Sequence, residues 1–267
     1  MAASGWRRSS PMTQPIGIFD SGLGGLSVLR YARERFPDEA FVYLADQRWA
    51  PYGDRSREEV FSYTNLAVNR LIELDVKGVV IACNTASDVA LERMRELHPH
   101  LPFVGIEPAV KPAVASSRSG IVGVLATTGT VTGTRLRSLI SKYAGSCTVL
   151  TQACPGLVEL IEDGLGDSQQ AEALLSEYVT PLVAAGADTL VIGCTHYSFV
   201  ADRIGAIAGP TVMIIDPADA VAKQIGRAMT MDGTAGGTRY ETSGDAVRMR
   251  RQLQEMFDEE SAVYPSR

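Results

Sequence analysis

The chain has 267 residues, of which 45% are hydrophobic, a formal net charge of −6 and a pI of about 5.2. This length can bury a substantial core in one large or two ordinary domains, and the acidic balance argues against a nucleic-acid partner. No apolar run reaches the roughly 18 residues that a membrane span needs, so no membrane partner is expected.

The N-terminal stretch and the cysteines are typical of a cytoplasmic protein. Residues 1–14 carry two arginines but no apolar stretch after them, so they are predicted to be a disordered extension and not a signal peptide. The four cysteines form no CxxC pair and are too sparse for a disulfide scaffold. Reduced thiols in the cytoplasm are therefore expected.

From residue 15 onward, short β-rich runs alternate with longer helical patterns. Ser56 and Glu59 form a capping-box pattern before apolar residues at helical spacing, and 88–97 and 169–185 are further predicted helices. The alternation predicts an α/β fold of mainly parallel sheets with helices on both faces. The predicted strands are Ile16–Asp20, Phe41–Ala45, Gly78–Ala82, Phe103–Ile106, Ile121–Ala126, Val149–Ala153, Thr189–Gly193 and Val212–Asp216.

Two stretches of the sequence resemble each other. GVVIACNTAS (78–87) and TLVIGCTHYS (189–198) each lead an apolar run to one cysteine, and these cysteines lie 111 positions apart. IGIFDSG (16–22) is echoed by VGVLATTG (122–129) at an offset of 106. We interpret both echoes as an internal duplication, although any two strand–turn–helix units look somewhat alike. The predicted domains are residues 15–106 with 217–267, and residues 107–216; the segment after about Pro217 is predicted to be helical and to pack on the first domain.

The candidate reactive groups are Cys83 and Cys194. Ligands of a parallel α/β sheet bind beyond the carboxyl ends of its strands, where both cysteines are predicted to lie. A cysteine at a helix N-terminus has its thiolate favoured by the helix dipole. Either cysteine alone reads most simply as a small buried hydrophobe, but facing domains would bring one thiol to each side of a shared cleft. One thiol could then remove a proton from a carbon and the other return one to the opposite face, which inverts a stereocentre without redox or metal chemistry.

His196 follows Cys194 by two positions. Alternation along an extended backbone would point both side chains to one side, where the imidazole could tune the thiol or carry its proton. A structural histidine is the alternative. A zinc site is disfavoured because only His196 lies near a cysteine in sequence.

The tips of two predicted strands carry further polar groups. Asp20 could order a substrate ammonium group or a thiol, or simply cap a helix. The glycines that follow at 22, 24 and 25 let the backbone approach an anion, and a carboxylate fits such donors as well as a phosphate does. The equivalent tip in the second half offers the hydroxyls of Thr127, Thr128 and Thr130.

Seven segments, in chain order between about Ile16 and Asp216, together resemble the cofactor-independent glutamate racemases of bacterial cell-wall synthesis. They are GIFDSGLGGLSVL, YLADQRWAPYGDRS, VIACNTAS, IEPAVKPA, VLATTGTV, CPGLVELIEDG and LVIGCTHYS. The resemblance implies two pseudo-symmetric α/β domains with the active site in the cleft between them, glutamate as substrate, no cofactor, no metal and a homodimer.

The resemblance also implies residue roles. Cys83 would exchange the Cα proton of D-glutamate with help from Asp20. Cys194 would exchange that of L-glutamate with help from His196 and Glu162. Residues that match substrate-holding positions are Asp20, Ser21, Tyr52, Gly53, Asn84, Thr85, Thr127, Thr130, Thr195 and His196.

The sequence departs from the family pattern at Trp49, which is bulkier than expected before the Pro-Tyr-Gly turn. Glu159 and Glu162 compete for one role, and the spacing to the Cys-Pro pair favours Glu162. Cys147 and Cys154 are predicted to be structural. Two other functions stay open on the residues alone: a racemase of aspartate or another acid on the same scaffold, and a non-catalytic module that senses a small ligand.

Overall fold

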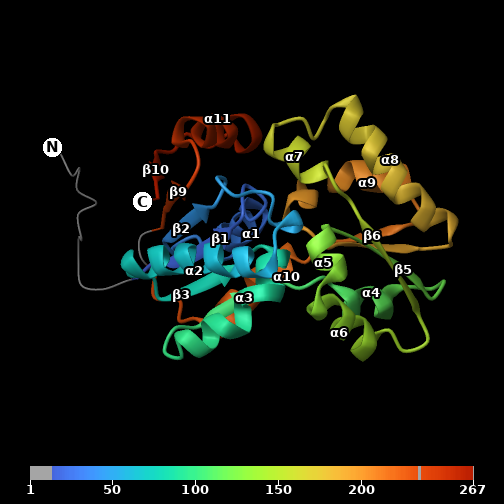
Figure 1. Cartoon of the computed structure of the whole chain (residues 1–267), viewed down its shortest axis with the longest axis horizontal. Helices are drawn as coiled ribbons and strands as arrows, with labels where there is room; N and C mark the ends of the chain where they lie inside the picture. Colours follow the sequence, from blue (N-terminus) through green and yellow to red (C-terminus); the bar gives the residue numbers. More distant parts are fainter. Residues whose placement is uncertain (1–13, 234–235, 267) are drawn as a thin grey trace.

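The computed structural model describes residues 14–233 and 236–266. Two fully parallel sheets lie side by side, with helices around each (Figure 1). The larger sheet has the strand order β10-β9-β2-β1-β3-β4. Its strands are β1 (Ile16–Asp20), β2 (Phe41–Ala45), β3 (Gly78–Ile81), β4 (Phe103–Gly105), β9 (Thr238–Thr242) and β10 (Val263–Pro265).

The smaller sheet has the order β6-β5-β7-β8. This repeats the order β2-β1-β3-β4 of the larger sheet, so the two halves share one topology. Its strands are β5 (Ile121–Ala126), β6 (Thr148–Ala153), β7 (Thr189–Ile192) and β8 (Met213–Ile215). The eight predicted strands are therefore confirmed, with ends that differ by at most one residue.

The registers of strand pairing also agree with an internal duplication. Ile16 lies opposite Gly78 in the larger sheet, and Val122 lies opposite Thr189 in the smaller one. The corresponding residues are separated by 106 and 111 positions, the two offsets that the sequence echoes carry. The cysteines that follow β3 and β7 thus occupy equivalent places at the carboxyl ends of equivalent strands.

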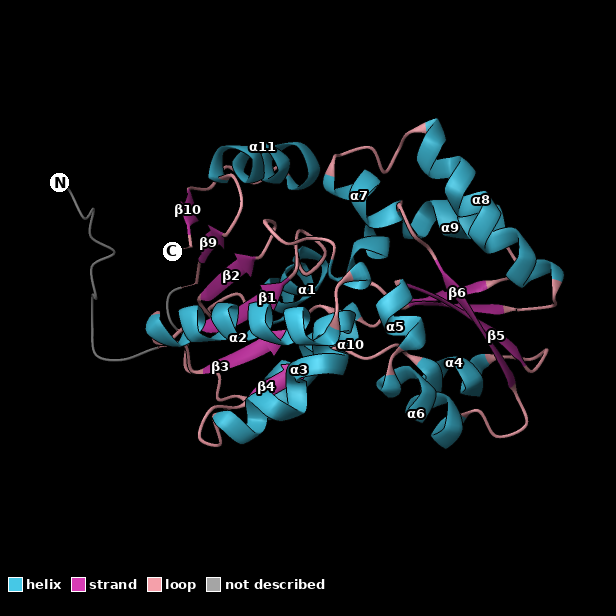
Figure 2. Ribbon diagram, in the orientation of Figure 1, coloured by secondary structure: helices cyan, strands magenta, loops and turns pink. Residues whose placement is uncertain are grey.

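Helices cover both faces of the larger sheet (Figure 2). One buried cluster joins Ile16 and Ile18 to α1, α10 and α11, and the other joins Phe19 to α2 and α3, as alternation along β1 requires. The capping box at α2 is confirmed, because Ser56 and Glu59 each accept from the other's backbone N–H. The helices are α1 (Leu26–Arg35), α2 (Arg57–Glu73), α3 (Asn84–Leu97), α10 (Ala218–Ala228) and α11 (Ala246–Phe257), with a short 3₁₀ turn at Tyr52–Asp54.

The smaller sheet is covered in the same way. One buried cluster packs α7, α8 and α9 against it, and another packs α4 and α6 on the opposite face. The helices are α4 (Val110–Ser116), α5 (Thr128–Thr132), α6 (Thr134–Tyr143), α7 (Leu157–Glu162), α8 (Gln169–Ala184) and α9 (Ala201–Ala208), with the 3₁₀ helix η2 (Thr195–Val200). No helix in the described part of the chain combines the length and hydropathy needed to cross a membrane.

The C-terminal segment is only partly helical, which corrects the prediction. After α10, which packs on α1, β9 pairs in parallel with β2, and β10 extends the edge. The sequence did not predict β9, because the charged residues Arg239 and Glu241 interrupt its apolar pattern. Glu241 is fully buried and pairs with Arg239 and with Arg70 on α2, so the charges sit inside an ion-pair cluster. The residue limits 106 and 216 stay predictions, and of the predicted extension only Gln14 lies within the described residues.

Candidate active site

The two thiols lie in the wall of one small cavity between the two sheets. Cys83 follows β3 and is the N-cap of α3, where its Sγ accepts a hydrogen bond from the Ala86 N–H at 3.5 Å. Cys194 follows β7 and precedes η2. Both side chains are buried. The other residues that line the cavity are Ser21, Pro51, Tyr52, Gly53, Asn84, Thr85, Thr127, Val158, Thr195 and His196.

The cavity is nearly closed. Its volume is about 10 Å³, which is the space of about one water molecule. A larger hollow of about 830 Å³ lies elsewhere, where α1 approaches η2 and α11, but no cysteine lines it. We therefore choose the small cavity as the candidate site because both thiols line it, and not because of its volume. A cavity of this size cannot hold an organic ligand, so its walls must move before one can enter.

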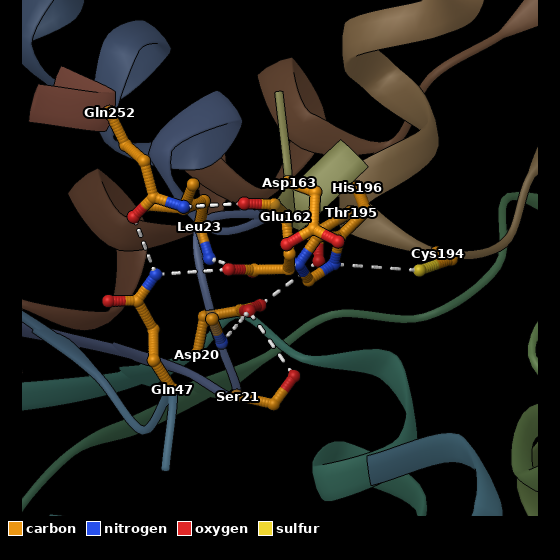
Figure 3. A network of polar contacts seen from close by, with 12 residues as sticks. Asp20, Ser21, Leu23, Gln47, Glu162, Asp163, Cys194, Thr195, His196 and Gln252 are labelled. Atoms are coloured by element: carbon orange, nitrogen blue, oxygen red, sulfur yellow. Dashed lines mark hydrogen bonds and ion pairs between the residues drawn. The ribbon is translucent and has the colours of Figure 1, made fainter. Parts of the chain in front are cut away.

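A chain of three side chains supports Cys194 (Figure 3). His196 Nδ1 lies 3.9 Å from the Cys194 Sγ, and His196 Nε2 lies 2.6 Å from the Glu162 Oε1. The expected contact between cysteine and histidine is present, although the backbone differs from the extended one that we predicted. His196 lies in the 3₁₀ helix η2, which turns its ring toward the sulfur.

The His196–Glu162 pair is charged at neutral pH. Burial lowers the pKa of His196, but its contacts with Cys194 and Glu162 outweigh this effect and raise the pKa well above the ordinary value. Burial raises the pKa of Glu162, but the hydrogen bond and positive charge of His196 outweigh it and lower the pKa. The charged imidazole of His196 therefore lies next to the Cys194 sulfur, within reach of a proton held there.

We expect this pair to make stability depend on pH. A raised histidine pKa contributes stability that is full below the unfolded value of about 6.5 and is lost as pH rises through the folded value. The lowered Glu162 pKa contributes stability that is full above the unfolded value of about 4.3 and is lost as pH falls. Thermal unfolding should therefore separate the parent from Glu162→Gln most between about pH 4.3 and 6.5. The separation should shrink at higher pH.

The matched control for this experiment is Glu159→Gln on the exposed side of the same helix. Its unfolding midpoint should follow the parent's at every pH. A difference between parent and Glu162→Gln that stays constant from pH 4 to pH 9 would contradict the charged pair.

The glycine-rich loop after β1 binds a carboxylate that belongs to the protein itself. The Leu23 N–H donates to Glu162 Oε1 at 2.6 Å. A Cβ on Gly22 would overlap the Glu162 carboxylate, and one on Gly24 would overlap Thr195 and His196. We expected these glycines to let the backbone approach a ligand. Instead they let the loop approach Glu162 and His196 from the other half of the molecule.

Asp20 joins the two halves on the Cys83 side. Its Oδ1 accepts from the Gly22 N–H at 2.9 Å and from the Ser21 hydroxyl at 3.4 Å. Its Oδ2 accepts from the Thr195 hydroxyl at 3.0 Å. Burial raises the pKa of Asp20 despite these donors and the nearby His196.

The N-terminus of α3 does favour the Cys83 thiolate, as expected, because the Ala86 N–H lowers the Cys83 pKa, but other effects in the closed cavity outweigh it. Burial, with the negative charge of Asp20 as the second cause, raises the pKa of Cys83 to about 12. These effects outweigh the Ala86 N–H and the Ser21 hydroxyl, which lower it. Cys83 is therefore a protonated thiol at neutral pH. Cys194 is not at an α-helix start, because η2 is a 3₁₀ helix of six residues.

The polar side chains of Asn84, Thr85 and Thr127 line the cavity. The side-chain amide nitrogen and oxygen of Asn84 are both buried without a partner among the described residues. The hydroxyls of Thr85 and Thr127 lie 2.9 Å apart across the boundary between the halves and bond to each other. The Thr130 hydroxyl contacts both of them, but Thr130 does not line the cavity. Leaving a buried amide unpaired is costly, so Asn84 is suited to a polar ligand.

Other predicted cavity residues have protein partners. The Tyr52 hydroxyl donates to Asp46 at 2.5 Å, and Gly53 packs on Thr127 across the boundary. Trp49 stacks on Tyr63 with ring centroids 4.8 Å apart and does not line the cavity.

The remaining candidates lie away from the cavity wall. Glu162, and not Glu159, contacts His196; Glu159 is exposed. Cys154 is buried in the hydrophobic cluster beneath the smaller sheet, and Cys147 is half-buried. Two glutamines that the sequence did not predict, Gln47 and Gln252, contact Glu162. The only signal for Gln47 was its place in the segment before the Pro-Tyr-Gly turn.

Comparisons with known proteins agree with this geometry. The family model for Asp/Glu/Hydantoin racemase matches residues 27–225. A glutamate racemase from Ectopseudomonas mendocina (strain ymp) is 44% identical over 94% of this chain and 97% of its own length. Among solved structures, glutamate racemase isoform RacE1 from Bacillus anthracis is 29% identical with a TM-score of 0.86, covering 94% of this chain and 96% of that one.

A second solved structure is the Escherichia coli glutamate racemase in complex with L-glutamate and the activator UDP-MurNAc-Ala. It is 29% identical with a TM-score of 0.84, covering 95% of this chain and 98% of that one. The facing α/β halves and the match of the family model over most of the sequence lead to one conclusion. The chain belongs to the Asp/Glu/hydantoin racemase family.

Proposed function

We propose that the protein interconverts L- and D-glutamate by moving the Cα proton between two thiols. One observation carries the proposal: Cys83 and Cys194 line one cavity from equivalent positions of two equivalent sheets. The glutamate racemases that are 44% identical over nearly the whole chain support glutamate as the substrate.

The two thiols have different partners, which suits them to opposite tasks. Cys83 is protonated in the closed cavity, while Cys194 lies beside the imidazolium of His196. Starting from L-glutamate, the Cys194 thiolate takes the Cα proton and becomes a thiol. Cys83 gives its proton to the opposite face of the carbon and becomes a thiolate. The electron pair stays on the carbon throughout, so no oxidant or reductant is needed, and the reverse sequence starts from D-glutamate.

Neighbouring groups support each step. We assign Asp20 to Cys83, and His196 with Glu162 to Cys194. The Ala86 N–H and the Ser21 hydroxyl, which lower the Cys83 pKa, would stabilise its thiolate after the proton has left. Negative charge that develops on the substrate requires donors already in place. The substrate-holding residues that we propose are Ser21, Tyr52, Gly53, Asn84, Thr85, Thr127, Thr130 and Thr195.

We expect Asn84→Ala to lower kcat/KM for glutamate by about tenfold to a hundredfold, because a hydrogen bond to a charged ligand is lost. The loss should be equal in both directions, since the enantiomers have equal free energies and their kcat/KM values must match. Initial rates of racemisation measure it. The control is Asn69→Ala on the exposed face of α2. An Asn84→Ala enzyme with the parent's kcat/KM would remove Asn84 from the substrate site.

Comparing substrates tests the function itself. Purified protein without added cofactor should racemise glutamate and should incorporate solvent deuterium at Cα of glutamate faster than at Cα of aspartate. Faster exchange with aspartate would favour the sister racemase. Absence of exchange with both acids, together with a measurable affinity for either one, would favour a ligand-sensing module.

We also propose that the protein works in the cytoplasm as a homodimer and supplies D-glutamate for peptidoglycan synthesis and cell shape. The support is the resemblance to glutamate racemases. The gene should rescue a bacterial strain that requires D-glutamate, and light scattering of the purified protein should give twice the chain mass.

A further inference from the structure

Two glutamines of the first half lock Glu162 of the second half in place (Figure 3). Gln47 follows β2, and its Nε2 donates to Glu162 Oε2 at 3.0 Å and to Gln252 Oε1 at 3.0 Å. Gln252 lies on α11, and its Nε2 donates to the backbone carbonyl of Glu162. Glu162 thus receives one donor on its carboxylate and one on its backbone from this pair.

The orientation of both amides is fixed by their other partners. The Thr242 hydroxyl donates to Gln47 Oε1 at 3.1 Å, which turns the Gln47 NH₂ toward Glu162. Gln252 Oε1 accepts from Gln47, which turns the Gln252 NH₂ toward the Glu162 carbonyl. Gln252 is only 5% exposed, so water could not replace these hydrogen bonds if the amide were removed.

Glu162 uses its other carboxylate oxygen for catalytic support. Oε1 contacts His196 Nε2 at 2.6 Å and the Leu23 N–H at 2.6 Å. The donor from Gln47 occupies Oε2 and so prevents the carboxylate from rotating away from His196. The chain of contacts runs from α11 through Gln252 and Gln47 to Glu162, His196 and Cys194. Neither glutamine lines the cavity that holds the thiols.

We propose that Gln47 and Gln252 are positioning residues for the half-reaction at Cys194. They hold Glu162 against His196 only when the two halves are closed, because they belong to one half and Glu162 belongs to the other. When the half that carries α11 closes on the other half, the same contacts also place Glu162 and His196 beside Cys194. This inference rests on the proposed two-thiol racemisation, and it predicts no direct effect on Cys83.

The test uses Gln47→Leu and Gln252→Leu in the full chain, with Gln254→Leu as the control. Gln254 lies on the exposed side of α11 and bonds only to Asp258 among the contacts described. We expect kcat/KM for glutamate to fall about tenfold to a hundredfold in each of the first two variants. The control should match the parent. Thermal unfolding of each variant checks that it is folded; should Gln252→Leu fail to fold, Gln252→Glu removes the donor at equal size.

A simple loss of activity would not separate positioning from general damage, so the readout is directional. Because kcat/KM must be equal in both directions, the asymmetry is sought in isotope effects. A slower proton transfer at Cys194 limits the rate in both directions. With L-glutamate deuterated at Cα, Cys194 removes the deuterium, so the label takes part in the slow step. With D-glutamate deuterated at Cα, Cys83 removes the deuterium, so the label takes no part in it. The primary isotope effect should therefore rise with L-glutamate and should not rise with D-glutamate.

A double-mutant comparison completes the test. If the glutamines act through Glu162, adding Gln47→Leu to Glu162→Gln should cause little further loss. Fully multiplicative losses, or isotope effects that rise equally for both enantiomers, would overturn the positioning role. A parent protein that does not racemise glutamate would instead overturn the proposed function, so the two failures are distinguishable.

Discussion

Serine in place of either Cys83 or Cys194 is expected to reduce kcat/KM for glutamate by at least about 10²- to 10⁴-fold, because we propose each thiol as the acid or base at one face of Cα. An alcohol at the same place binds its proton too tightly to act as a base at neutral pH. Either substitution should impair both directions equally, since each direction uses one thiol to remove a proton and the other to return one. Polarimetry or circular dichroism of glutamate measures the loss.

The two remaining cysteines provide controls. Cys147 is half-buried and Cys154 is buried beneath the smaller sheet, and neither lines the cavity. Cys147→Ser should keep the parent's activity. A Cys83→Ser or Cys194→Ser enzyme with activity within tenfold of the parent's would refute the two-thiol assignment.

Alanine at Gly24 is expected to lower kcat/KM by about 10²-fold or more, because misplacing a catalytic group by about 1 Å can cost that much. A Cβ at this position would overlap the Thr195 hydroxyl and the His196 ring in the closed structure. Either the halves would fail to close or His196 would move away from Cys194. Steady-state kinetics measure the loss, and binding of glutamate measured by calorimetry shows whether the site still forms.

The matched control is Gly205→Ala in α9. The nearest atom to an added Cβ there is 3.7 Å away, and alanine favours a helix. This variant should be at least as stable as the parent and fully active. A Gly24→Ala enzyme with the parent's kinetics would show that the close approach of the loop to His196 is not needed for turnover.

The sequence alone predicts the sheets well, because their strands are short apolar runs between glycines and polar residues. The repeat is also readable, since both halves keep one register and the offsets of 106 and 111 reappear in the strand pairing. Strand β9 escaped because Arg239 and Glu241 interrupt its apolar pattern. Their burial depends on Arg70, which lies far away in the sequence.

Part of the candidate site could be predicted from the sequence, because cysteine and histidine are reactive residue types, as with Cys83, Cys194 and His196. The roles of these residues stay predictions, and the burial and charged neighbours of each side chain could not be predicted from the sequence. The protonated state of Cys83 follows from burial and from Asp20, which only the folded chain brings near. Gln47 and Gln252 carry no signal in one sequence, because a glutamine becomes specific only through the partners that orient its amide.

The most direct measurement of the central claim follows the first turnovers of L-glutamate in deuterium oxide, with purified protein and no added cofactor. Two thiols on opposite faces predict that the D-glutamate product carries deuterium at Cα while the recovered L-glutamate is still unlabelled. Product that keeps the original hydrogen, or deuterium that appears equally early in both enantiomers, would contradict the assignment of one thiol to each face.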